Sequence, residues 1–310
     1  MHVARIGVCR DVAGPSASCL TWMRTSTSMN DSSLSSWTRS TRIAHVSDVH
    51  MLERRPGGSR SGADFASRVV SIGRELDADD RVRKLKRSLD AAWRSGAGHL
   101  VVSGDLTEVG TRGQYEMFAE VLHDGPFRPD QVTLTPGNHD AYTRGAWDEA
   151  LQGPLAAFRE SSAKAPGHVV DRGDVVFVPI DVACHQAITR SSGELTNATA
   201  DAVAKRLDDT AFRSKTVILV QHHPPYRHTS WAWQWIDGLR GWARMMDFLS
   251  SRTNLALLHG HLHKVVDRIV GRGMSRVFAA PATVEDGDRP RVRLYDVRGG
   301  VLESVGLANA

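Results

Sequence analysis

The chain has 310 residues, of which 24% are charged and 41% hydrophobic, as in an ordinary globular protein with a sizeable core. Its formal net charge is +4, but residues 1–42 hold five Arg against two Asp, so the rest of the chain carries only +1. A nucleic-acid-binding surface would need a large basic surplus, and three cysteines are too few for a disulfide framework. No apolar run approaches the roughly 20 residues of a membrane-spanning helix.

Residues 1–42 are rich in Ser and Thr and show neither a helical nor a strand period. We predict a disordered N-terminal extension here; a transit peptide, or a true start nearer Met23 or Met29, remain alternatives. The segment lacks the apolar stretch of a secretory signal, so we expect a cytoplasmic protein. Residues 43–310 show no repeat or linker and are predicted to form one domain.

From residue 42 onward, short apolar runs alternate with helical patterns. The predicted strands are RIAHVS, HLVVS, QVTLT, VVFVPI, TVILVQ, LALLHG, RVFAA, RVRLYDV and VLESV. Helices are predicted over 80–94, where Val82, Leu85, Leu89 and Trp93 recur at helical spacing, and over 111–122, which begins with Thr111. This alternation predicts a layered α/β fold with helices covering the sheets.

Metal-ligand residue types directly follow five of the predicted strands. Because α/β sheets gather their sites at the carboxyl ends of strands, we expect these side chains to converge in one crevice. They are Asp48, His50, Asp105, Asn138, His139, His222, His261 and His263. The alternative for each set alone is a polar turn, since Pro, Gly, Asn and Asp favour turns for backbone reasons.

The mixture of imidazole and carboxylate indicates which ions the crevice would hold. A carboxylate such as Asp105 can bridge two cations, and the mixture suits Mn, Fe or Zn better than Mg or Ca. In extended backbone, the pairs D-x-H and H-x-H would place both side chains on one face.

The blocks SDVH, SGDLTE, PGNHD, QHHPP and HGHLH, in this order, resemble the calcineurin-like metallophosphoesterase superfamily over roughly residues 43–283. The resemblance implies a catalytic domain with a four-layer α/β/β/α sandwich of two mixed sheets. It also implies two divalent metal ions, the first bound by Asp48, His50, Asp105 and His263 and the second by Asp105, Asn138, His222 and His261.

In such an enzyme a hydroxide bridging the two metals would attack the phosphorus. His139 would face the phosphate and protonate the leaving oxygen. We expect Glu108, or alternatively Asp140, to orient His139. Purple acid phosphatases place a Tyr ligand where Glu108 stands, so redox-quiet Mn, Fe(II) or Zn is expected.

The closest resemblance is to bacterial class III 3′,5′-cyclic-nucleotide phosphodiesterases, which implies a cyclic nucleotide as the small-molecule substrate. Two segments depart from that subgroup: an insertion over 53–76, predicted as a mobile loop and lid, and a Trp-rich stretch that starts at Tyr226. We expect His223, Trp231 and Trp233 to contact the substrate. The alternatives are a phospholipid-type diester, a nucleotide-sugar diphosphate, a phosphomonoester, a nuclease or a non-catalytic scaffold. The oligomeric state stays open.

Overall fold

The computed structural model describes residues 42–54, 66–67, 69, 71, 74–253, 255–272 and 274–309. The predicted N-terminal extension lies outside the described residues except for Arg42, and so does most of the loop and lid predicted over 53–76. In the part of the chain that is described, no helix is both long and apolar enough to cross a membrane.

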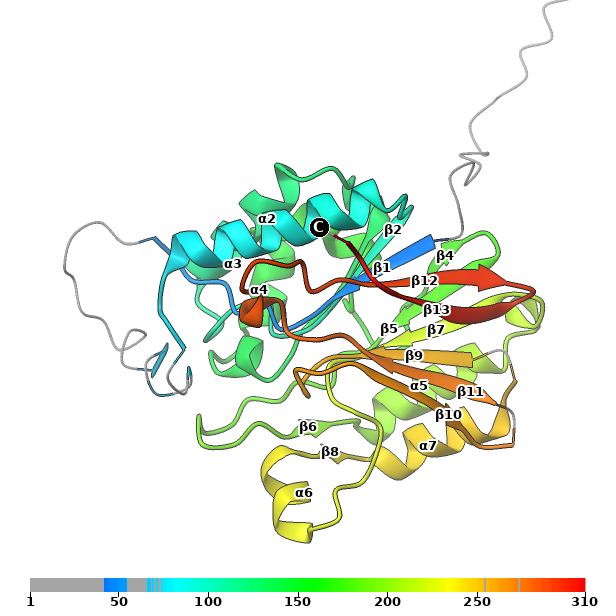
Figure 1. The fold of residues 1–310 in the computed structure, drawn as a ribbon. Helices are drawn as coiled ribbons and strands as arrows, with labels where there is room; N and C mark the ends of the chain where they lie inside the picture. The colour runs from blue at the N-terminus through cyan, green and yellow to red at the C-terminus, as the bar shows by residue number, and fades with distance from the viewer. Residues whose placement is uncertain are drawn as a thin grey trace, which may run out of the picture. The chain divides into compact units, whose positions relative to one another are not determined.

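Two large mixed sheets and one small two-stranded sheet make up the β-structure (Figure 1). The first sheet has the order β13-β12-β1-β2-β3, the second β10-β11-β9-β7-β5-β4, and the small one pairs β6 with β8. The strands are β1 (Arg42–Val46), β2 (His99–Ser103), β3 (Val132–Thr135), β4 (Val170–Arg172), β5 (Val175–Pro179), β6 (Gly193–Glu194), β7 (Thr216–Val220), β8 (Leu239–Arg240), β9 (Leu255–His259), β10 (Val266–Val270), β11 (Ser275–Ala279), β12 (Arg293–Arg298) and β13 (Val301–Leu307).

Helices cover the outer face of each large sheet. They are α2 (Ala78–Arg94), α3 (Arg112–His123), α4 (Ala146–Gln152), α5 (Asn197–Leu207) and α7 (Trp242–Ser251). The short helix α6 (Trp231–Asp237) lies beside β8 of the small sheet instead (Figure 1). The first apolar cluster joins α2, α3 and α4 to the first sheet, and the second joins α5 and α7 to the second sheet. A third cluster, which includes Ile43, Val101, Phe177 and Ile218, fills the space between the sheets. The fold is therefore two mixed sheets flanked by helices, as predicted.

Each of the nine predicted apolar runs is a strand, and both predicted helices are present. Helix α2 buries Val82, Leu85 and Leu89, while Trp93 at its end stays 37% exposed. Helix α3 begins after Thr111, whose side chain accepts a hydrogen bond from the Gln114 main chain. Buried apolar runs bounded by turn residues are strong strand signals, which explains the agreement.

The direction of the strands brings the predicted ligands to one edge. Strands β1, β2 and β3 are parallel to one another in the first sheet, and β5, β7, β9 and β11 are parallel in the second. Main-chain hydrogen bonds continue past the strand ends: Asp48 N donates to Gly104 O (3.1 Å), and Gly260 N donates to His222 O (3.0 Å). The loops that carry the ligands are thus held together by their own backbones.

Candidate active site

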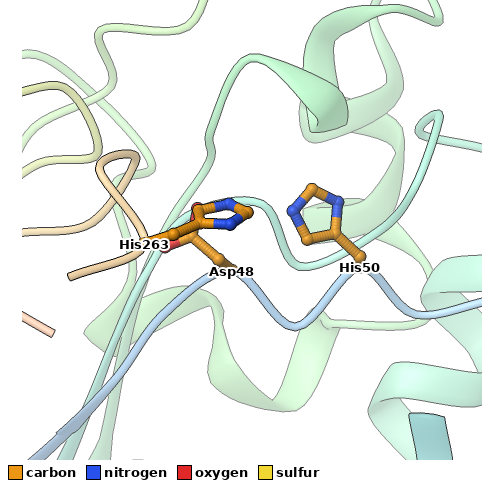
Figure 2. A group of neighbouring side chains, drawn as sticks. All are labelled: Asp48, His50 and His263. Carbon is orange, nitrogen blue, oxygen red and sulfur yellow. The ribbon is translucent and has the colours of Figure 1, made fainter. Parts of the chain in front are cut away.

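Asp48, His50 and His263 form one group of side chains that could hold a metal ion (Figure 2). His263 Nε2 lies 3.3 Å from Asp48 Oδ1, and the rings of His50 and His263 are 5.7 Å apart. Asp48 and His50 follow β1, whereas His263 follows β9 in the other sheet. The two sheets therefore each supply part of one group.

Asp105, at the end of β2, is the carboxylate shared by the remaining groups. Its Oδ2 lies 3.2 Å from His222 Nε2, 3.7 Å from His50 Nε2 and 4.0 Å from His139 Nε2. Burial raises the pKa of Asp105, but the imidazoles of His222, His139 and His50 outweigh burial and hold the pKa well below its usual range. A carboxylate surrounded by imidazoles in this way has the position that a bridging ligand requires.

Several buried polar atoms of the predicted ligands have no hydrogen-bond partner among the described residues. They are Asp48 Oδ1, His50 Nε2, Asn138 Oδ1 and His222 Nε2. An unsatisfied buried polar atom costs about 1–3 kcal/mol, so a convergent set of them is expected where a cation belongs. The donor set is carboxylate, amide oxygen and imidazole, which fits Mn, Fe or Zn.

Main-chain carbonyls fix the tautomers of His222 and His139. His222 Nδ1 lies 2.8 Å from Ser103 O, and His139 Nδ1 lies 2.8 Å from Glu108 O. Because a carbonyl oxygen only accepts, each Nδ1 carries the proton and each Nε2 faces Asp105. This arrangement leaves the His222 Nε2 lone pair for a metal ion and the His139 Nε2 for a reacting oxygen.

The carboxylate of Glu108 does not orient His139, which corrects the sequence-based expectation. Its nearest oxygen is 3.9 Å from His139 Nδ1, and the hydrogen bond comes from the main-chain carbonyl instead. The carboxylate accepts from Ser71 Oγ (3.1 Å) and Arg74 Nη2 (3.2 Å), and its second oxygen lies 3.6 Å from His50 Nδ1. The described part of the 53–76 segment therefore reaches the site through Glu108.

Asp140, the alternative partner of His139, ties two loops together instead. Its carboxylate accepts hydrogen bonds from the main-chain N–H groups of Leu106, Thr107 and Gly137. Burial, and next the charge of Asp105, raise the pKa of Asp140 to about 6. Asp140 fixes the loop after β2 against the loop after β3, and so positions His139 only indirectly.

The ligand residues do not have the extended backbone that we expected for D-x-H and H-x-H. Six described residues other than glycine have positive φ, and five of them are Asp48, His50, Asp105, His261 and His263. These φ values, from 49° to 68°, are left-handed, a conformation that costs of order 1 kcal/mol or more outside glycine. Left-handed turns, rather than strand alternation, bring the paired side chains together.

Asn138 and His261 lie at the same site but face it differently. The Nδ2 of Asn138 is 3.5 Å from the Tyr142 hydroxyl, which leaves Oδ1 as the free ligand atom. The His261 ring lies 5.2 Å from the His222 ring, and its main-chain N–H donates to Asp48 Oδ2 (3.2 Å). His261 Nε2 is bonded to Asp237 Oδ1 at 2.9 Å, so only Nδ1 is left for a metal ion.

The three side chains predicted to contact the substrate differ in their exposure. His223 is fully buried, and its Nε2 lies 2.6 Å from Ser191 O. Trp231 and Trp233 on α6 are 78% and 59% exposed. Trp235 on the same helix lies under the guanidinium of Arg190, 4.1 Å from the ring centre.

Four functional candidates were not predicted from the sequence: Tyr142, Arg190, Asp237 and Glu285. The Tyr142 ring packs on the His139 ring at 5.0 Å, and its hydroxyl donates to Arg190 O at 3.3 Å. Arg190 Nη2 donates to Trp235 O at 3.0 Å. Tyr142, Arg190 and Trp235 therefore form a continuous rim from His139 to α6, here called the aromatic rim.

Comparison with known families agrees with this geometry. Residues 41–265 match the family described as calcineurin-like phosphoesterase, which is well over half of the chain. The chain belongs to this family. It is a metal-dependent phosphoesterase, and a site for two divalent metal ions is typical of such enzymes. No curated protein matches the sequence.

Solved structures share the fold at low sequence identity. A dimetal phosphatase from Danio rerio superposes with a TM-score of 0.62 at 11% identity, over 88% of this chain and 100% of that one. The purple acid phosphatase PPD1 from yellow lupin superposes with a TM-score of 0.51 at 9% identity, over 83% of this chain and 49% of that one. At such identities the likeness concerns the fold alone.

Proposed function

We propose that this metallophosphoesterase hydrolyses phosphodiesters, with a cyclic nucleotide such as cAMP as the favoured substrate. The observation that carries the proposal is the convergence of unpartnered buried atoms from Asp48, His50 and His222 around the Asp105 carboxylate. The unpartnered Oδ1 of Asn138 belongs to the neighbouring loop, whose His139 N donates to Asp105. Asp48, His50, Asp105 and His263 would hold one ion, and Asp105, Asn138, His222 and His261 the other. When bound, such ions stabilise charge on the phosphoryl oxygens and lower the pKa of water.

His139 would serve as the proton donor in this reaction. Its Nδ1–H is committed to Glu108 O, so only Nε2 is free toward the site. Nε2 lies 4.0 Å from the Asp105 carboxylate, and it carries a transferable proton when the ring is an imidazolium. Protonation of the leaving oxygen from Nε2 would prevent an alkoxide from forming.

The aromatic rim supports a nucleotide rather than a bare phosphodiester. Trp235 is 55% exposed, and Arg190 covers part of its ring, so the remaining surface is open to a flat ligand. Stacking of a base on an aromatic ring contributes about 1–3 kcal/mol. Tyr142 connects this surface to His139, which would place a base next to the phosphate being cleaved.

A lipid-like or other diester is the competing substrate, and the exposure of Trp231 and Trp233 favours it. The test is hydrolysis by Mn-reconstituted protein of bis(p-nitrophenyl) phosphate, p-nitrophenyl phosphate, 3′,5′-cAMP, 2′,3′-cAMP and a glycerophosphodiester. Preference for diesters with turnover of a cyclic nucleotide supports the proposal. Turnover of the aryl and glycerol diesters alone would discard the nucleotide and keep the chemistry.

Trp235→Ala gives a sharper test of the rim. Loss of one stacked base at 1–3 kcal/mol raises KM for cAMP by about 5- to 150-fold. The KM for bis(p-nitrophenyl) phosphate should change much less. Trp93→Ala is the matched control, because Trp93 is a partly exposed Trp on α2, away from the rim. Equal effects of Trp235→Ala on both substrates would refute a base-stacking role.

A further inference from the structure

Each histidine of the H-x-H pair is hydrogen-bonded to a carboxylate that belongs to no recognised motif. His261 Nε2 lies 2.9 Å from Asp237 Oδ1, at the end of α6. His263 Nδ1 lies 2.7 Å from Glu285 Oε1, in the short 3₁₀ turn Thr283–Glu285. An ionised carboxylate only accepts, so the bonded nitrogen of each ring carries the proton.

The two carboxylates select opposite nitrogens. Asp237 holds Nε2 of His261, which leaves the Nδ1 lone pair, whereas Glu285 holds Nδ1 of His263, which leaves the Nε2 lone pair. The free His263 Nε2 lies 3.3 Å from Asp48 Oδ1, inside the group of Figure 2. Two histidines two positions apart in the chain thus present different ring nitrogens to the site.

Asp237 is itself held in place from several sides. The Ser191 hydroxyl donates to the same carboxylate oxygen, Oδ1. Ser191 N donates to Ile236 O (2.9 Å), and Gly193 N donates to Gly238 O (3.2 Å), so the backbone on both sides of Asp237 is paired. Asp237 therefore stands on a fixed support, built from the small β6–β8 sheet and the end of α6.

We propose that Asp237 and Glu285 are positioning residues, each of which fixes the tautomer and the ring orientation of one H-x-H histidine and so governs retention of one metal ion. The proposal rests on the proposed function, because it needs the two-metal site. Carboxylates that orient ligating histidines typically contribute 10- to 100-fold to metal affinity. Asp237 also joins the Trp-bearing helix α6 directly to a metal ligand.

The test measures Mn²⁺ binding to metal-free full-length protein by calorimetry and by metal analysis after gel filtration. Wild type should bind two ions per chain. Asp237→Ala and Glu285→Ala should each weaken one ion by about 10- to 100-fold and leave the other unchanged, and the double variant should weaken both. Asp237→Asn keeps an oxygen acceptor for His261 Nε2–H and should recover most of the affinity.

Glu194→Ala is the matched control. Glu194 pairs with Arg240 (2.7 Å) across the β6–β8 sheet that supports Asp237, so its removal perturbs the support without touching His261. Wild-type binding by Glu194→Ala is expected. Weakening by Glu194→Ala as large as that by Asp237→Ala would show a purely structural effect and overturn the proposal.

The outcomes separate the two claims. A wild-type protein that binds no pair of ions would overturn the proposed function itself. Two ions in wild type, with unchanged affinities in Asp237→Ala and Glu285→Ala, would overturn only the positioning roles. If Asp237→Ala does not fold, Ser191→Ala removes the hydroxyl that anchors Asp237 and should weaken one ion by a smaller factor; unchanged affinity there would count against the role of Asp237.

Discussion

Replacement of Gly137 by Ala adds only one methyl group, but it should strongly impair the predicted metal site. A Cβ at Gly137 would lie 2.2 Å from Asp105 Oδ1 and 2.4 Å from Asp105 N, whereas real Cβ contacts essentially never fall below 3.0 Å. The carboxylate must therefore move by about 0.8 Å, and the main chain of Asp105 by about 0.6 Å. A rotation of the Asp105 side chain alone cannot relieve the clash, because one of the three atoms closer than 3.0 Å is the main-chain N of Asp105.

The displacement falls on the residue that both metal ions would share. A misplacement of about 1 Å can lower a catalytic rate by about 100-fold, and overpacking typically costs about 1–3 kcal/mol of stability. The displacement of Asp105 would also lengthen the hydrogen bond from His139 N to Asp105 Oδ1, which is 2.9 Å in the wild type. For Gly137→Ala we expect a loss of kcat of about 100-fold, reduced Mn content and a melting temperature lower by roughly 2–10 °C.

The assays are hydrolysis of bis(p-nitrophenyl) phosphate, metal analysis after gel filtration and thermal melting. Gly287→Ala is the control, since a Cβ there would meet nothing within 4 Å and its φ is not in the left-handed range. Wild-type kcat and two bound ions in Gly137→Ala would refute the reasoning, because the loops would then tolerate a contact that the geometry forbids.

Three further changes test other parts of the site. Asp105→Asn should abolish turnover and leave at most one bound ion, and activity that survives chelation would contradict a metal-dependent mechanism. Glu108→Gln should weaken Mn²⁺ binding, because the Glu108 carboxylate lies near His50. It should leave the pH dependence of kcat unchanged, because the main-chain carbonyl of Glu108 orients His139. A shifted pH profile would show that the carboxylate orients His139 after all. In metal-free protein, burial lowers the pKa of both His222 and His263. The negative charge of Asp105 beside His222, and that of Asp48 beside His263, outweighs burial and raises each pKa to about 9. Their contribution to the stability of the metal-free protein is complete below the unfolded pKa near 6.5 and is lost as the pH rises through 9. Metal binding at pH 7 should then release about two protons, and metal affinity should increase toward pH 9. Calorimetry in buffers of different ionisation enthalpy measures the number of protons released. A number near zero would contradict the prediction.

The strands and most predicted ligands could be located from the sequence because both depend on local signals. Apolar runs ended by Gly, Pro, Asn or Asp mark strands that stop at a site, and the parallel order brings those ends together. The structure places Asp48, His50, Asp105, His139, His222 and His263 within metal-binding distance of one another in overlapping groups. The strand pattern alone predicts a layered α/β fold, whereas the two-sheet sandwich and the division of the ligands between two metal ions were implied by the family resemblance.

The partners of the ligands could not be predicted, because they depend on tertiary contacts. Asp237 is 24 residues from His261, and Glu285 is 22 residues from His263, with no motif linking either pair. The sequence also cannot distinguish the carbonyl of Glu108 from its carboxylate as the partner of His139. The sequence also cannot show that Trp235, among the three Trp of α6, packs under Arg190, because that packing is a tertiary contact.

The left-handed backbone at the ligands explains why the loops are so tightly bonded to one another. Asp48, Asp105 and His261 have φ values of 54°, 49° and 68°, and each such conformation costs free energy that local sequence does not repay. Tertiary contacts offset that cost: Asp48 N bonds Gly104 O, His139 N bonds Asp105 Oδ1, and His261 N bonds Asp48 Oδ2. The same bonds hold the ligand atoms in position before any ion binds. A site built in this way is preorganised, so substitutions in the loops should alter metal affinity before they alter the fold.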